Sequence, residues 1–408
     1  MKASTTLGAR DLPALTGAEW RLLIILAGLN FTHIVDFMIL MPLGPQLMRL
    51  FQIGANEFGL LVSSYSFAAG VSGFAGIFFL DRFDRKRALL CIYAGFIFGT
   101  FACALAPTSA TLLAARAFTG AFGGLLGTTV MTIVSDAIPA SKRGRAMGIV
   151  MSAFAVASVV GVPAALALAN VYTWHAPFVL VGGLAILLSL AVARFVKSQR
   201  AHLDPQEDAP LATPAFLRDT AKDPLRLTAL GLTALLMLAQ FTVIPFISPS
   251  LVANVGFRED QLPLMYLIGG GFTIFTSPWV GKLCDRYGRP PVFLIASILV
   301  LIPFYAVTHL GPTPLIPALS VAALFFVLNN ARFVSAWAMI TSTVRAQERG
   351  RFLSLNSAVQ SLAGAAAAWL GSSIVQSAPD GRILHYGKVG WISIGFSIVA
   401  IFVARRLK

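Results

Sequence analysis

Long apolar stretches and short polar turns alternate along the whole chain. Each stretch has roughly the 20 residues that a helix needs to cross the hydrocarbon core of a bilayer. Such spans lie near residues 21–47, 57–80, 88–106, 110–136, 145–169, 174–196, 225–252, 261–281, 290–309, 314–343, 351–376 and 386–404. They are too long, and too uniformly apolar, for the strands of a membrane β-barrel. The pattern predicts an all-α integral membrane protein with twelve transmembrane helices.

The composition agrees with a membrane protein and excludes several other classes. Of the 408 residues, 57% are hydrophobic and 12% are charged, and the mean hydropathy is +0.79. A soluble protein carries about 25% charged residues. The net charge of +14 arises from basic residues in the turns, so we expect no nucleic-acid partner. Three scattered cysteines form no disulfide or metal-binding pattern, and we expect no metal or cofactor.

The distribution of Lys and Arg predicts the orientation, because these residues concentrate on the cytoplasmic side. With both termini in the cytoplasm, 25 of the 31 basic residues lie inside. Only four lie outside, namely Arg49, Arg258, Arg382 and Lys388, and the other two, Arg116 and Arg332, lie within spans. We therefore expect a multi-pass protein of the plasma (inner) membrane. The long polar segment 197–224 reads as a cytoplasmic linker between two six-helix bundles, 1–196 and 225–408. Residues 1–20 lack the pattern of a signal peptide, so we expect the first span to stay in the mature protein.

The two halves share motifs at nearly constant spacing. The pairs are "LDRFDRKR" (80–87) with "CDRYGRP" (284–290), and "SKRGRAMG" (141–148) with "QERGRFLS" (347–354). Asp81 and Asp285 are 204 residues apart, and Arg143 and Arg349 are 206 apart. Parallel repeats of this kind are typical of transporters, whose substrate site lies near the membrane midplane between the repeats.

These motifs resemble those of the major facilitator superfamily, and the resemblance covers essentially the whole chain. "RAFTGAFGGLLG" (116–127) is similar to the family's Arg-Gly pattern in span 4, and "ASVVGVPAALAL" (157–168) to the Gly-Pro motif of its proton-coupled antiporters. The first loop motif departs from the family pattern, because Asp84 replaces the usual glycine. The match points to the twelve-helix drug/proton antiporter and sugar-efflux branch. It implies two pseudo-symmetric bundles and a central cavity lined by spans 1, 4, 7 and 10.

The loop motifs place acidic and basic residues together at the cytoplasmic ends of the helices. Such a cluster can lock helices in one state and break in another, and in the family it acts as a conformational latch. The predicted latch residues are Asp81, Arg82, Arg85, Asp136, Asp285, Arg286 and Arg289. The alternative is that the basic residues only fix the topology.

A polar stripe in span 1 carries the candidate coupling site. Asn30, His33 and Asp36 fall within an arc of about 120° on a helix, and Asp36 is the single acidic residue deep inside a span. Intramembrane acids mark proton and ion pathways. Burial and a neighbouring arginine act in opposite directions on a carboxyl group, so we expect Asp36 to exchange protons, with His33 and Arg116 beside it. The alternatives are a static Asp36–Arg116 pair, and a packed His33 that relays nothing.

The repeat extends the candidate site to the second half. The offset of 204 relates Asp36 to Gln240 in span 7. Arg332 lies too deep in span 10 to reach the membrane surface easily, so we expect it to face the cavity, and either Arg116 or Arg332 to influence Asp36. The predicted cavity residues are Asn30, Phe37, Gln240, Asn329, Asn330 and Arg332. The glycines of span 4 are expected to allow close helix packing.

The sequence therefore predicts a secondary transporter that exports a small molecule by proton antiport and alternating access. Its expected partners are the substrate, protons and the lipid bilayer, and the expected state is a monomer. A uniporter, a symporter or a lipid or lysolipid flippase on the same fold remains open. A membrane-embedded enzyme or sensor is the remote alternative, since neither a catalytic motif nor an appended soluble domain is present.

Overall fold

The computed structural model describes residues 15–199, 213–344 and 348–407, and most of them are helical. The first group of helices is α1 (Gly17–Ile39), α2 (Gly44–Phe51), α3 (Ala55–Phe79), α4 (Arg85–Ala104), α5 (Ser109–Ala137), α6 (Ala140–Val156), α7 (Val162–Val171) and α8 (Ala176–Phe195). Short turns of other helix types are η1 (Leu80–Arg82), η2 (Ala157–Gly161), η4 (Leu251–Val255) and η5 (Glu259–Gln261).

The second group follows the linker. It comprises α9 (Thr213–Lys222), α10 (Pro224–Phe241), α11 (Ile244–Ser250), α12 (Leu262–Tyr287), α13 (Arg289–Leu299), α14 (Leu301–His309), α15 (Leu315–Ser342), α16 (Arg349–Ile374) and α17 (Tyr386–Ala404). Strands β1 (Gln376–Ser377) and β2 (Ile383–Leu384) form a small antiparallel hairpin before α17. The predicted linker 197–224 thus contains a helix, α9, in its described part.

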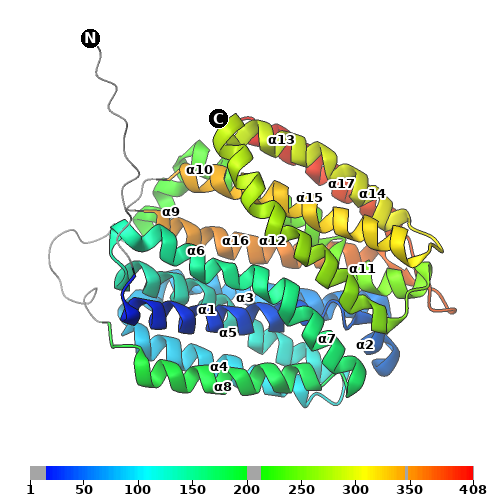
Figure 1. Ribbon diagram of the computed structural model, residues 1–408, viewed down its shortest axis with the longest axis horizontal. Coiled ribbons are helices and arrows are strands. Elements are labelled where there is room, and N and C mark those ends of the chain that lie inside the picture. The colour runs from blue at the N-terminus through cyan, green and yellow to red at the C-terminus, as the bar shows by residue number, and fades with distance from the viewer. Residues whose placement is uncertain (1–14, 200–212, 345–347, 408) are drawn as a thin grey trace, which may run out of the picture.

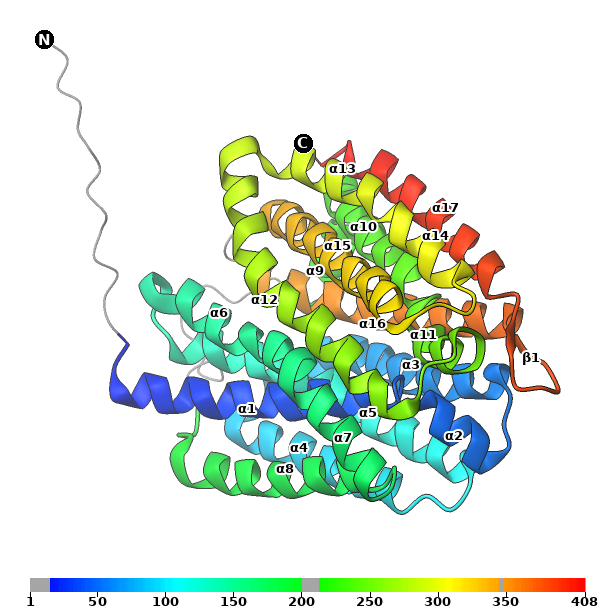
Figure 2. The ribbon, with the colours of Figure 1, turned by 45° about the vertical axis from the view of Figure 1, so that its right-hand side comes forward.

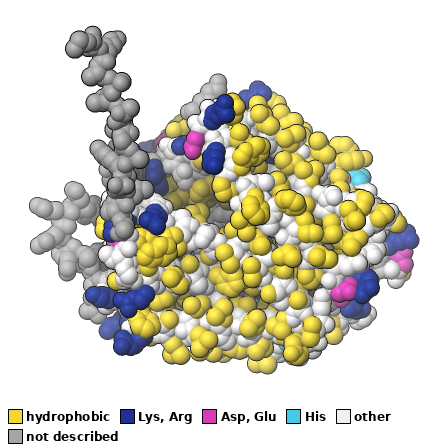
Figure 3. Space-filling view, viewed as in Figure 1, with side chains coloured by type: hydrophobic (Ala, Val, Ile, Leu, Met, Phe, Trp, Pro, Cys, Tyr) yellow, Lys and Arg dark blue, Asp and Glu magenta, His cyan; other side chains and the backbone are white. Residues whose placement is uncertain are grey.

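Within the described residues, ten helical segments are long and apolar enough to cross a membrane. The predicted spans 261–281 and 351–376 correspond to α12 and α16, which are 26 residues long each but are not among those ten. Hydrophobic side chains spread over the middle of the visible surface, and Lys and Arg gather toward its ends (Figure 3). The all-helical membrane architecture is confirmed, and the number twelve stays a prediction.

Prolines divide several of the predicted spans. The span expected at 21–47 is split into α1 and α2 around Pro42 and Pro45, and the span at 225–252 is split into α10 and α11 just before Pro245. Proline lacks the amide N–H that continues a helix and restricts the residue before it. Both breaks fall at related places in the repeat. The span predicted at 21–47 was too long, because α1 ends at Ile39, whereas Pro224–Val255 as a whole is apolar and long enough to cross a membrane.

The two groups of helices lie side by side and pack against each other. In Figures 1 and 2, α1 to α8 occupy the lower part of the molecule and most of α10 to α17 the upper part. Helix α3 packs along α16, and α7 packs against α12, where the groups meet. Inside the first group, α3 and α5 approach closely, because a Cβ atom on Gly124 would lie 2.1 Å from the carbonyl oxygen of Ala69. The expected packing role of this span-4 glycine is supported.

The apolar core is shared by both groups at one end of the molecule and divided at the other. Around α2 and α11, one cluster contains Phe58 of the first group and Phe246 of the second. Toward the start of α1, Leu23 belongs to a cluster of the first group and Phe352 to a separate cluster of the second, which Ile77 of α3 also touches. We call these the joined end and the split end; they lie at the right and left of Figure 1.

Candidate functional site

Asp36 and Arg116 form a buried ion pair at the centre of the candidate site. Asp36 lies in the last turn of α1 and Arg116 two turns into α5, and their side chains are at most 1% exposed. Arg116 Nη1 donates to Asp36 Oδ2 at 2.9 Å and to the backbone oxygen of Asp36 at 3.0 Å. Thr100 of α4 donates to Asp36 Oδ1 at 3.2 Å. Both carboxylate oxygens are therefore bonded.

Tyr65 of α3 completes the surroundings of the pair. The Arg116 guanidinium lies over the Tyr65 ring, 4.3 Å from its centroid, which is a cation–π contact. A buried ion pair is favourable only when its remaining polar atoms are also satisfied. Here the terminal guanidinium nitrogen Nη1 is bonded by a carboxylate and a backbone carbonyl and the guanidinium lies on an aromatic face, while Nε has no hydrogen-bond partner among the described residues. Sequence reasoning missed both Thr100 and Tyr65.

The other polar residues of the α1 stripe lie toward the split end. His33, one turn before Asp36, is half-buried, and its ring centroid lies 6.3 Å from that of Tyr65. Asn30, one turn further, is half-buried and donates to the backbone oxygen of Val150 on α6 at 3.3 Å. Along the stripe, the half-buried side chains of Asn30 and His33 are therefore followed by the fully buried side chain of Asp36.

Phe37 connects the candidate site to the second group of helices. Its ring centroid is 5.3 Å from that of Tyr65 and 6.0 Å from that of Phe241, at the end of α10. Gln240, the residue related to Asp36 by the repeat, precedes Phe241 and is half-buried. The structure therefore brings Phe37 and the neighbourhood of Gln240 together where the groups meet.

Arg332 lies elsewhere, inside the second group. Its Nη1 donates to Ser397 on α17 at 2.9 Å, and its Nη2 donates to Asn329 at 2.9 Å. Its guanidinium is 5.4 Å from the ring centroid of Phe304 on α14. This face of α15 is turned toward α14 and α17. The contacts of Arg332 therefore do not support the expectation that it influences Asp36. The arginine that contacts Asp36 is Arg116.

Asn330 points in a third direction. Its Nδ2 donates to Ser277 of α12 at 2.6 Å, while the neighbouring Asn329 donates to the backbone oxygen of Phe325 on its own helix. Neither contact involves a residue of the Asp36 cluster. The structure thus separates the span-10 residues that the sequence grouped into one cavity.

The first copy of the predicted latch is formed in part. Arg85 Nε donates to Asp136 Oδ2 at 3.0 Å, which joins the start of α4 to the end of α5. Asp84 accepts a bond from the Arg87 backbone N–H at 3.0 Å and caps α4, so the residue that replaces the family's glycine has a structural role. Arg82 is exposed, and the side chain of Asp81 lies outside the described residues.

The second copy is more open. Arg289 donates to the backbone oxygen of Ala338 on α15 at 3.0 Å. Asp285 and Arg286 are exposed, and the Arg286 guanidinium lies 5.2 Å from the ring centroid of Tyr287. In this copy Arg289 bonds a backbone oxygen near the end of α15, whereas Arg85 of the first copy bonds the carboxylate of Asp136.

At the joined end, polar bonds cross from one group to the other. Both terminal nitrogens of Arg49 on α2 bond the carboxylate of Glu259 on η5, at 2.5 and 3.2 Å, and this carboxylate raises the pKa of Arg49. Asn170 of α7 donates to the Glu259 backbone oxygen at 3.3 Å and accepts from Gln46 at 2.8 Å. These four residues, the joined-end clamp, fasten the groups together.

At the split end, the ion pairs found in the described residues remain inside one group. Lys142 of α6 pairs with Glu19 of α1 at 3.1 Å in the first group. Arg226 of α10 pairs with Glu348, which precedes α16, at 2.5 Å in the second. This difference between the two ends agrees with the division of the apolar core.

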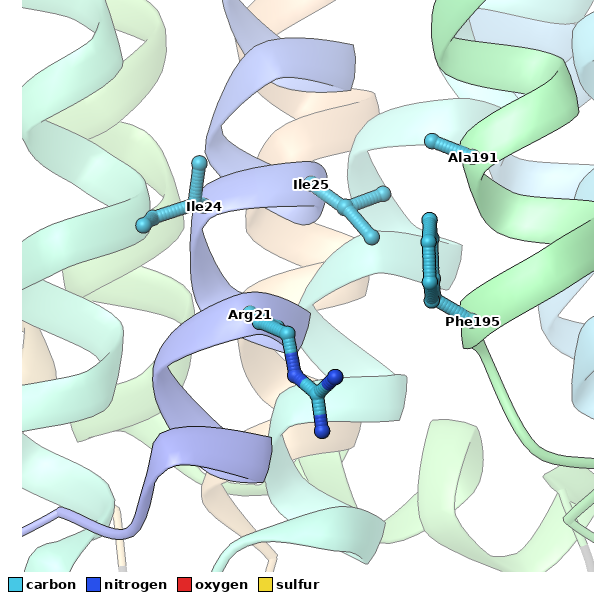
Figure 4. Close-up of a pocket in the computed structure, with 5 residues that line it drawn as sticks. All are labelled: Arg21, Ile24, Ile25, Ala191 and Phe195. Atoms are coloured by element: carbon cyan, nitrogen blue, oxygen red, sulfur yellow. The ribbon is translucent and has the colours of Figure 1, made fainter.

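Two hollows lie away from the Asp36 cluster. One, of about 210 Å³, opens between α1 and α8, where Ile25 and Phe195 face each other and Arg21 lies nearby (Figure 4). The other, of about 360 Å³, is near the second latch copy and is lined in part by Asp285 and Arg289. Neither is lined by Asp36 or its bonding partners.

Comparison with known proteins gives a consistent result over nearly the full length. The sequence model of the Major Facilitator Superfamily matches residues 26–368 and 229–407. The inner membrane transport protein YdhP of Escherichia coli (strain K12) is 27% identical over 382 residues, covering 90% of this chain and 91% of the relative. A probable sugar efflux transporter of Helicobacter pylori (strain J99 / ATCC 700824) is 24% identical over 255 residues, covering 62% and 63%.

Solved structures with the same fold include two transporters. A bacterial homolog of the human lysosomal transporter Spinster, inward-facing and occupied, aligns with a TM-score of 0.75 and 15% identity, covering 97% of each chain. A D-xylose-proton symporter aligns with a TM-score of 0.71 and 17% identity, covering 94% of this chain and 96% of the other. At these identities the likeness shows the fold alone.

Proposed function

Because the chain belongs to the major facilitator superfamily and is a multi-pass membrane transporter, we propose that it exports a small molecule in exchange for protons. The observation that carries this proposal is the Asp36–Arg116 pair, whose side chains are at most 1% exposed. A carboxylate in the membrane interior is costly and marks a proton or ion pathway in transporters. Protonation of Asp36 removes the negative charge of the pair, so it weakens the ion pair that joins α1 to α5.

The difference between the two ends supports alternating access. We assign the joined end to the outside and the split end to the cytoplasm, in line with the distribution of Lys and Arg. The structure then represents a state closed to the outside, held by the joined-end clamp. The proposed architecture is two bundles, 1–196 and 225–408, which hold twelve spans and are joined by the 197–224 linker. The bundles would rock against each other, so that the joined-end clamp breaks while the split end closes around the Arg85–Asp136 latch.

Proton antiport supplies enough free energy for export. A proton that moves inward across 100 mV releases about 2.3 kcal/mol. Since about 1.4 kcal/mol corresponds to a tenfold ratio, one proton can concentrate an uncharged solute well over tenfold. Sugars are the first solutes to test, because relatives are named probable sugar efflux transporters.

The proposal is tested in two steps. A thermal-shift screen of the purified protein against sugars, drugs, amino acids and lysolipids identifies a solute that stabilises the folded state. Transport of that solute is then measured in proteoliposomes with an imposed pH gradient. We expect wild-type protein to move the solute against its gradient, a protonophore to abolish this, and Asp36→Asn to leave only downhill movement.

Other outcomes of the same assay identify other modes. Solute movement that ignores the protonophore indicates a uniporter, and protons and solute moving in the same direction indicate a symporter. Uphill transport by Asp36→Asn at the wild-type rate would overturn the role of Asp36.

A further inference from the structure

Asp36 is closed off from accessible space in the structure. Its side chain has no exposed area, and its two carboxylate oxygens are bonded by Arg116 and Thr100. A proton can therefore reach it only through neighbouring side chains. On α1, the next polar residue toward the split end is His33, which is half-buried. His33 lies at the border between accessible space and the closed carboxylate.

Apart from Arg116 Nε in the ion pair itself, two polar atoms beside the pair have no hydrogen-bond partner among the described residues. They are Nδ1 of His33 and the hydroxyl of Tyr65. Tyr65 is only 2% exposed, and buried polar groups are nearly always bonded. The Arg116 guanidinium over the Tyr65 ring fixes that ring next to the ion pair. Unsatisfied groups at such a place are available for a functional step.

Gly123 of α5 brings these two groups to the same point. A Cβ atom on Gly123 would lie 2.4 Å from the Tyr65 hydroxyl and 3.0 Å from Nε2 of His33. The neighbouring Gly120 and Gly124 instead face backbone atoms of α3, which they allow to approach. Gly123 therefore differs from the packing glycines, because the place of its missing side chain is taken by a hydroxyl and an imidazole, which can approach each other there.

We propose that His33, Tyr65 and Gly123 form the route by which Asp36 exchanges its proton with the split end. This inference rests on the proposed function of Asp36 as the coupling acid. On loading, the imidazolium gives one N–H proton to the Tyr65 oxygen, while the Tyr65 hydroxyl passes its own proton on to the carboxylate. The tyrosine O–H bond is re-formed, the imidazole ends neutral and Asp36 gains one proton. Release is the reverse.

The remaining titratable and charged groups around Asp36 lie off this route. Arg116 from α5 bonds the carboxylate directly, and Cys103 from α4 has its thiol 3.7 Å from the Thr119 hydroxyl. Neither connects Asp36 to accessible space, since both side chains are buried. His33 is the half-buried titratable group in the cluster.

The test is a stopped-flow measurement of proton uptake by the full chain in detergent. A rapid acid jump is followed with the dye pyranine, and the part of the uptake that Asp36→Asn removes is assigned to Asp36. Tyr65→Phe deletes only the hydroxyl, and we expect it to slow the Asp36-dependent uptake by about a hundredfold or more. His33→Gln should slow it similarly, and the double variant should be no slower than the slower single variant, since both lie on one route.

Tyr93→Phe is the matched control. Tyr93 is a buried tyrosine of the same group, but its hydroxyl is bonded to Thr32 at 2.8 Å. We expect this variant to take up protons at the wild-type rate. If Tyr65→Phe is as fast as wild type, or if Tyr93→Phe is slowed as much, the proposed route is overturned while the coupling role of Asp36 stands. If Asp36→Asn leaves the uptake unchanged, the proposed function itself fails.

Discussion

Removal of Arg116 tests how strongly the buried pair holds the fold. The Arg116→Met variant keeps an unbranched apolar side chain but loses two bonds to Asp36 and the contact with the Tyr65 ring. Breaking a buried ion pair by deleting one partner costs about 3–5 kcal/mol, because the other charge stays buried without compensation. At roughly 2.1 cal/mol/K per residue, a loss of this size lowers Tm by about 4–6 °C for a chain of this length.

The assay is thermal unfolding of the purified protein in detergent, completed by a double-mutant cycle. Asp36→Asn combined with Arg116→Met leaves neither charge in the interior, so we expect it to recover at least half of the lost Tm. The matched control is Arg258→Met. Arg258 pairs with Asp260 at the surface, where the two side chains are 74% and 53% exposed, and such pairs contribute at most about 1 kcal/mol.

Two results would refute this reasoning. The first is an Arg116→Met variant that unfolds at the same temperature as Arg258→Met, since the buried pair would then contribute no more than an exposed one. The second is a double variant whose loss of stability equals the sum of the losses in Asp36→Asn and Arg116→Met. The coupling between the two sites would then be absent, and the loss would come from packing around the methionine.

Two further predictions concern the joined end and the helix contacts. Arg49→Gln removes the Arg49–Glu259 pair of the joined-end clamp, whose side chains are 67% and 21% exposed, so the closed state loses about 1 kcal/mol and the outward-open population rises by up to about fivefold. Distances between spin labels on α2 and η5 measure this shift. A charge-swapped Arg49→Glu/Glu259→Arg protein should restore the closed state. Gly124→Ala should destabilise by about 1–3 kcal/mol, because the new methyl group meets the Ala69 carbonyl oxygen, whereas Gly127→Ala, with open space around it, should be neutral or slightly stabilising in the same unfolding assay.

Much of the fold is predictable because the bilayer restricts the length and polarity of every span. The predicted spans coincide with helical segments, some of which are divided near prolines, and the span predicted at 21–47 extends beyond the end of α1 at Ile39. The sequence shows that Pro42 or Pro245 interrupts the hydrogen bonding of a helix. It does not show whether the chain kinks and continues or starts a new helix, because the packing of α2 against α11 decides this.

The candidate site was predictable where charge made residues conspicuous. Asp36 and Arg116 are rare types in an apolar span, and the structure pairs them. Thr100 and Tyr65 gave no such signal, because threonine and tyrosine are common in membrane helices. The depth of Arg332 was predicted, but its direction was not, since the rotation of α15 depends on its packing against α14 and α17. Side-chain type reveals candidates, and helix rotation decides which of them meet.

The most direct test of the central claim is to count the protons released when solute binds. Purified protein in weakly buffered solution is mixed with the solute identified by the thermal-shift screen, and a pH indicator reports the release. If Asp36 exchanges its proton for substrate, the wild-type protein releases up to about one proton per chain where Asp36 starts protonated, and Asp36→Asn releases none. Equal release by both proteins, or solute binding by wild-type protein without release at any pH, would contradict the account.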